Sequence, residues 1–192
     1  MATNIVKSIL AGFTIGIGSI MYLRTGGVAG AVLFAFGLIV IVHYRWNLFT
    51  GQAGFSTRAG FLASVLLFNI VGCWAASLLV ATGMNPIVET RLATGWTDVL
   101  LRSAGCGFIM TAAVRWAREE RWLPLLFGVP VFILCGFPHC IADVVYYLSC
   151  PADFLLENGG RIAGVYGLTV AGNFIGCNLY RVENWVDKTT KV

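Results

Sequence analysis

Long stretches without a charged residue dominate this sequence of 192 residues. No Asp, Glu, Lys or Arg occurs at 8–23, 25–44, 59–88, 103–114, 122–142 or 162–180. Charged residues make up 11% of the chain and hydrophobic residues 58%, whereas soluble domains are about 25% charged. A membrane-spanning helix needs about 20 mostly apolar residues. The pattern therefore predicts an all-α transmembrane protein, because a soluble fold would have to bury every long helix at once.

We expect six spans in a single membrane domain that covers residues 1–192. They lie at 6–24, 27–47, 60–82, 98–116, 122–149 and 161–181. Most basic residues fall on one side of the bilayer if both termini are cytoplasmic, as the positive-inside rule requires. Membrane topology thus accounts for the net charge of +4, and no nucleic-acid partner is predicted. We expect a multi-pass protein of the plasma (inner) membrane with a retained first helix.

Two of the six spans contain backbone that is unsuited to a continuous helix. The second runs into the polar and glycine-containing segment 47–54, and the fifth contains Gly136-Phe137-Pro138-His139. Proline lacks an N–H and disfavours helix immediately before it. Irregular backbone at membrane depth is tolerated only inside protein or beside a cavity. We therefore expect broken helices at about residues 48–56 and 135–139, which approach each other near the middle of the membrane.

A short internal repeat accompanies the breaks. The third span contains Asn69-Ile70-Val71-Gly72-Cys73, and the sixth contains Asn173-Phe174-Ile175-Gly176-Cys177. Each repeat follows a broken span, so the chain divides into halves of three spans, 1–88 and 89–192. Because three is odd, the second half must enter the membrane inverted. Inverted repeats with paired broken helices are typical of transport pathways, which makes Asn69 and Asn173 candidate pore residues.

His139 is the strongest candidate functional residue, because an ionisable side chain within a membrane is costly and usually functional. A neutral imidazole can hydrogen-bond an anion and a charged one can transfer a proton; a structural role is the alternative. Asp143 follows one helical turn later and fits three roles: an ionised partner of His139, a neutral acid, or a cap of the broken helix. Thr50 lies in the first break, where its hydroxyl can bind an anion or satisfy freed backbone groups.

Other residue types narrow the possible functions. Four bulky apolar residues near the breaks fit either pore gates or lipid-facing bulk: Phe34, Leu38, Phe49 and Phe132. The six cysteines include no C-x-x-C pair, and packing explains most of them. A haem or quinone enzyme needs paired histidines, but His43 and His139 lack matching spacing. We therefore predict no enzyme, no metal site and no cofactor.

Five motifs occur in order along nearly the whole chain. They are Gly37-Leu38-Ile39, Leu48-Phe49-Thr50-Gly51, Asn69-x-x-Gly72, Gly136-Phe137-x-His139-x-Ile141-Ala142 and Gly172-Asn173-x-x-Gly176. With these motifs the sequence resembles the formate/nitrite transporter family. The resemblance implies an aquaporin-like protomer in a homopentamer, with Thr50 and His139 facing each other in the pore. It also implies an anion-attracting Arg91 at the outer vestibule and apolar constrictions at Phe34, Leu38, Leu48, Phe49, Phe132 and Met110.

Four positions depart from the family pattern. Asn47 and Pro138 stand where glutamate is frequent, and Gly107 and Asp143 stand where asparagine is frequent. We expect a channel or transporter for small monovalent anions such as formate, nitrite or hydrosulfide, which pass as neutral acids with the help of His139. The alternative is an aquaporin-like pore for neutral small solutes, in which Asp143 repels anions.

Overall fold

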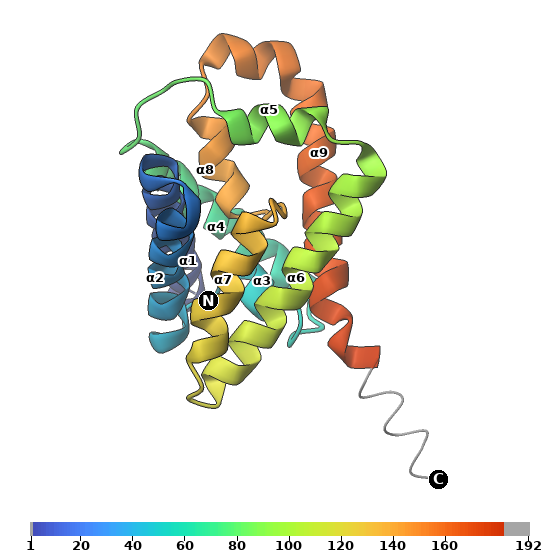
Figure 1. The fold of residues 1–192 in the computed structure, drawn as a ribbon. Helices are drawn as coiled ribbons and strands as arrows, with labels where there is room; N and C mark the ends of the chain where they lie inside the picture. Colours follow the sequence, from blue (N-terminus) through green and yellow to red (C-terminus); the bar gives the residue numbers. More distant parts are fainter. Residues whose placement is uncertain (1, 183–192) are drawn as a thin grey trace.

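The computed structural model describes residues 2–182, which fold into a bundle of helices (Figure 1). In chain order these are α1 Ala2–Thr25, α2 Gly27–His43, α3 Phe49–Gln52, α4 Ala59–Ser77, α5 Pro86–Ala93, α6 Trp96–Arg118, α7 Leu123–Leu134, α8 Ala142–Leu148 and α9 Ala152–Asn178. The expected all-α architecture is therefore present.

Four helices within residues 2–182 are long and apolar enough to cross a membrane: α1, α4, α6 and α9. The apolar helices α2 and α7 are shorter. Large apolar residues lie on the outside of the bundle, and Val28, Leu78 and Phe127 are 66%, 68% and 65% exposed. Apolar surface of this kind indicates contact with lipid or with another subunit.

The long helices pack in two matching pairs, α1 with α4 and α6 with α9. Each pair is close enough for backbone to touch backbone. Gly12 lies against the carbonyl of Asn69, and Gly107 lies against the carbonyl of Asn173. A Cβ atom at either glycine would overlap that carbonyl, so both crossings require glycine. The helix α2 packs against α7 between the pairs.

Helices α2 and α7 end early, and both are followed by irregular backbone. The first break comprises residues 44–58 and contains only the short helix α3, whereas the second comprises residues 135–141 between α7 and α8. These segments overlap the breaks expected at about 48–56 and 135–139. Gly136 has φ of 66°, a left-handed conformation that glycine adopts without steric cost. Figure 1 shows α8 continuing beyond α7 on the far side of the second break.

Two features of one end of the bundle were not expected. Residues 86–93 lie between the expected spans 60–82 and 98–116 but form α5, and α9 begins at Ala152 rather than at residue 161. The start of α5 has the signals of a helix N-terminus, because Pro86 occupies its first position and the Asn85 side chain accepts a hydrogen bond from the Ile87 N–H at 3.0 Å. Helix α5 and the first turns of α9 lie across the end of the bundle opposite the C-terminus (Figure 1).

Candidate functional site

The two breaks meet at a hydrogen bond between buried side chains. Thr50 Oγ1 lies 3.0 Å from His139 Nε2, although 89 residues separate them in the sequence. Thr50 is on α3, and His139 is in the second break. The exposed fractions of the two residues are 0% and 1%. The structure therefore brings together the two polar side chains that were expected to face each other.

The second ring nitrogen determines where the imidazole carries its proton. The backbone N–H of Ala142 donates to His139 Nδ1 at 3.1 Å. Since an N–H can only donate, Nδ1 must carry a lone pair, and the proton of the neutral ring is on Nε2. That N–H points at Thr50 Oγ1. The fold thus presents His139 as a hydrogen-bond donor at the junction of the breaks.

Asn69 holds the first break in place. Its amide Nδ2 donates to the carbonyls of Ser8 and Asn47 at 2.7 and 2.8 Å. Its Oδ1 accepts a hydrogen bond from the N–H of Phe49 at 2.8 Å. The amide therefore replaces backbone hydrogen bonds that are lost where the helix is broken.

Asn173 holds the second break by the same set of contacts. Its Nδ2 donates to the carbonyls of Ser103 and Pro138 at 2.8 and 3.0 Å. Its Oδ1 accepts from the N–H of Cys140 at 2.8 Å. Both asparagines were expected to line a pore, but their amides bind backbone and they are not among the residues lining the two cavities described below.

The six predicted constriction residues are all buried. None of these residues is more than 4% exposed. The six are Phe34, Leu38, Leu48, Phe49, Phe132 and Met110. The alternative that Phe34, Leu38, Phe49 and Phe132 face lipid is therefore wrong. The rings of Phe34 and Phe132 meet edge to face with centroids 6.1 Å apart. Phe132 also stacks on His139 at 5.5 Å, which places an aromatic layer directly against the imidazole.

One cavity opens beside the first break. It has a volume of about 490 Å³, and we name it the α2–α6 cavity. Leu38 and Leu48 form part of its apolar wall, and Arg45, Arg118 and Glu120 are among its charged wall residues. Arg118 was not singled out from the sequence, yet its Nη2 donates to the carbonyl of a residue in α3, Gly51, at 3.2 Å.

A second cavity opens beside the second break. It has a volume of about 310 Å³, and we name it the α5–α8 cavity. Phe132 and His139 lie in its wall together with Arg91, Arg102 and Asp143. The aromatic layer and the Thr50–His139 contact thus lie next to this cavity. Arg102 is exposed and was likewise missed by the sequence interpretation.

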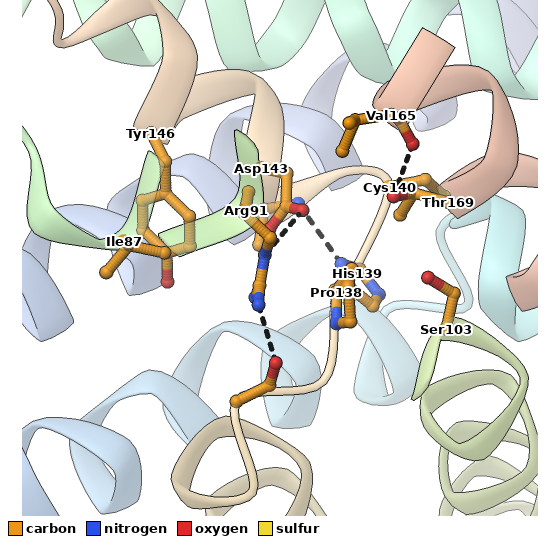
Figure 2. Close-up of polar contacts among 12 residues, drawn as sticks. Ile87, Arg91, Ser103, Pro138, His139, Cys140, Asp143, Tyr146, Val165 and Thr169 are labelled. Atoms are coloured by element: carbon orange, nitrogen blue, oxygen red, sulfur yellow. Dashed lines mark hydrogen bonds and ion pairs between the residues drawn. The ribbon is translucent and has the colours of Figure 1, made fainter. Parts of the chain in front are cut away.

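Arg91 and Asp143 form an ion pair in the wall of the α5–α8 cavity (Figure 2). Arg91 Nε lies 3.2 Å from Asp143 Oδ2, and Arg91 Nη1 donates to the carbonyl of Gly136 at 2.5 Å. Both residues are buried, with exposed fractions of 9% and 1%. Asp143 Oδ1 has no hydrogen-bond partner within residues 2–182.

The Arg91–Asp143 ion pair changes what was expected of each of its two residues. Asp143 does follow His139 by one helical turn, since its backbone N–H donates to the His139 carbonyl at 2.9 Å. Its ionic partner, however, is Arg91 and not the imidazole. Arg91, which was expected at an outer vestibule, lies in the wall of the α5–α8 cavity, and its charge is already paired with Asp143. One signal in the sequence pointed to such a pair: Asp143 stands alone in an apolar run, and a buried charge requires a partner.

The fold and the site together define a class of protein. Apolar helices surround two buried breaks, and the breaks meet between cavities that contain ionisable groups, as in helical membrane channels and transporters. The formate/nitrite transporter family model matches residues 1–182. The chain belongs to the formate/nitrite transporter family.

Solved structures share this fold. A protein described as a pentameric formate channel with formate bound superimposes with a TM-score of 0.75 at 16% sequence identity, covering 100% of this chain and 98% of that chain. A protein described as an FNT family ion channel gives a TM-score of 0.81 at 18% identity, covering 97% and 90% of the two chains. At these identities the likeness establishes the fold. Among curated protein sequences none matches the chain.

Proposed function

We propose that this protein is a channel or secondary transporter for small monovalent anions such as formate, nitrite or hydrosulfide, which cross its centre as neutral acids. One observation carries the proposal: the hydrogen bond between Thr50 and His139 joins the two breaks beside a cavity with cationic side chains. Membership of the formate/nitrite transporter family and the fold of a described formate channel support it.

The buried aromatic layer explains why neutralisation is needed. An ion that leaves water for an apolar passage pays a large desolvation cost unless it is paired or neutralised. Phe34 and Phe132 fill the space next to His139 with ring carbon, and this surface offers no compensating charge. A small acid that has taken up a proton passes such a layer at far lower cost than its anion.

His139 and Thr50 supply polar contacts at this point of the path. The Nε2–H of His139 is a donor that can turn from the Thr50 hydroxyl to an oxygen or sulfur atom of a solute. The hydroxyl of Thr50 can then donate to the same solute. These two groups orient a small acid while it passes the aromatic layer.

The architecture belongs to the same proposal. Six spans run as two inverted halves, 1–88 and 89–192, with both termini cytoplasmic in the plasma (inner) membrane. The identical backbone contacts of Asn69 and Asn173 support the two related halves. Five such protomers form a homopentamer, supported by the pentameric formate channel that shares the fold. The exposed apolar side chains then face lipid and neighbouring subunits.

Uptake into proteoliposomes tests the function. The purified chain is reconstituted and offered formate, nitrite, hydrosulfide or uncharged urea, and empty liposomes serve as the control. We expect uptake of at least one of the anions to exceed that of urea clearly. Urea uptake without any anion uptake would instead identify an aquaporin-like pore for neutral solutes.

A further inference from the structure

The wall of the α5–α8 cavity contains a carboxylate that the proposed function does not yet use. Asp143 is 1% exposed, and one of its oxygens binds Arg91 while the other has no hydrogen-bond partner within the described residues. Arg91 is held twice, by Asp143 and by the carbonyl of Gly136. A buried polar atom without a partner is rare and calls for an explanation.

His139 is poorly placed to supply the proton that neutralises an anion. Its Nδ1 accepts the backbone N–H of Ala142. A second proton on the ring would occupy this lone pair and leave that N–H without an acceptor at the start of α8. The ring can therefore donate a hydrogen bond from Nε2 while its charge stays constant. Asp143 is the acidic residue in the wall of the same cavity.

We propose that Asp143 transfers the proton that neutralises the anion, and that Arg91 alternates between Asp143 and the anion as its ionic partner. This inference rests on the proposed function. As the anion enters the cavity, a proton from the vestibule water adds to the Asp143 carboxylate, so that Arg91 exchanges one anionic partner for the other without an interval in which its charge is unpaired. The acid O–H of Asp143 breaks, its proton forms the new bond on the anion, and the carboxylate returns to Arg91 as the neutral acid leaves.

The buried charge stays constant throughout this cycle. At rest the cavity wall holds one guanidinium and one carboxylate, and after protonation it holds one guanidinium and one solute anion. At each stage the positive charge of Arg91 is paired, so no step leaves an uncompensated buried ion, which is the costly state. The transport that results is electroneutral, with one proton moving with each anion.

Among the side chains of residues 2–182, Arg91 is the only ionic partner of Asp143. Besides α5, titratable side chains near Asp143 come from α1, α6, α9, the second break and α8 itself. In that order they are Tyr22, Arg102 and Cys106, Tyr166, His139 and Cys140, and Tyr146 and Tyr147. Helices α4 and α7 contain no charged residue. Of the two cations, Arg102 is exposed to solvent, so its effect on the carboxylate is screened.

Formate uptake with simultaneous recording of internal pH tests this inference in proteoliposomes of the full chain. Wild type should take up formate faster as the outer pH falls, without a dependence on membrane potential. Asp143→Asn keeps the shape of the side chain but cannot transfer a proton. We expect its uptake to fall roughly 100-fold, the usual size of a positioned proton-transfer group, and to lose its pH dependence. Asp143→Glu should retain the pH dependence.

Two further measurements keep the test decisive. If Asp143→Asn fails to assemble, the paired variant Arg91→Gln/Asp143→Asn removes both charges together; it should assemble, and its uptake should be as low as that expected for Asp143→Asn and should not depend on pH. Wild-type uptake that carries net charge, or a wild-type pH profile in either variant, would overturn the inference. These outcomes leave the proposed function standing, whereas wild type that moves none of the three anions would overturn the proposed function itself.

Discussion

The two breaks are built alike and charged differently. In each, an asparagine from a long helix binds the irregular backbone, and an arginine binds a glycine carbonyl: Arg118 binds Gly51 and Arg91 binds Gly136. Arg91 is paired with Asp143. Arg118 has no acidic partner within residues 2–182 and instead packs on an aromatic ring at 3.9 Å.

The comparison separates the backbone shape of a break from the ionic pairing beside it. Hydrogen bonds from side-chain amides determine the shape of a break, and they are the same in both halves. The charges beside the two breaks differ although both arginines bind break carbonyls, because Arg91 alone has an acidic partner within residues 2–182. On the proposed mechanism a proton changes the pairing in the α5–α8 cavity, whereas the Arg118 charge in the α2–α6 cavity has no carboxylate partner within residues 2–182.

The largest effect is expected at the junction of the two breaks. His139→Phe removes the imidazole donor that contacts Thr50, so anion uptake should fall roughly 100-fold, because a buried group that loses its hydrogen-bond partner costs about 1–3 kcal/mol. His139→Asn is the matched variant, because its Oδ1 can still accept the Ala142 N–H although it does not reach Thr50. Both variants should lose uptake. Normal uptake by an intact His139→Phe protein would remove the imidazole from the mechanism.

The shared scaffold predicts equal losses of stability in the two halves. Asn69→Ala and Asn173→Ala each leave an N–H and two carbonyls without their partner. Each should lower the free energy of unfolding by about 3 kcal/mol, since a single unsatisfied buried group costs about 1–3 kcal/mol. Thermal unfolding in detergent measures both. A clear loss in one half alone would show that the two breaks are not held alike.

Alanine substitutions at equivalent glycines in the two halves should give a smaller loss of stability, of similar size in both halves. Gly12→Ala and Gly107→Ala place a Cβ atom against the carbonyls of Asn69 and Asn173, and such overpacking costs about 1–3 kcal/mol. Gly60→Ala is the control, because nothing lies within 4 Å of the added carbon. It should stabilise by up to about 1 kcal/mol. Comparable unfolding temperatures for all three variants would contradict the close helix crossings.

The smallest effect is expected from the exposed cation of the α5–α8 cavity. Arg102→Gln should lower formate uptake about two- to fivefold at low salt, since a unit charge at close range contributes about 1 kcal/mol in water. The loss should vanish at high salt, where exposed charges are screened. Arg91→Gln should lose uptake at every salt concentration, because Arg91 is buried in its ion pair. Equal salt dependence in the two variants would contradict this distinction.

Parts of this fold and site could be predicted from the sequence. Charge-free runs predicted the long helices, and the chemistry of Pro138 and its neighbours predicted the second break. Helix α5 was missed because its end signals, Asn85, Pro86, Glu89 and Arg91, lie within a helix of only 8 residues between two expected spans. The Arg91–Asp143 pair joins residues 52 positions apart. Such contacts depend on how helices pack, which no local pattern encodes.

Formate and proton uptake measured together at a clamped membrane potential test the central claim most directly. If the anion crosses as its neutral acid, wild type should take up about one proton per formate without net current, because the apolar layer admits only the uncharged species. His139→Phe should abolish both fluxes. A formate-dependent current without proton uptake in wild type would contradict the account.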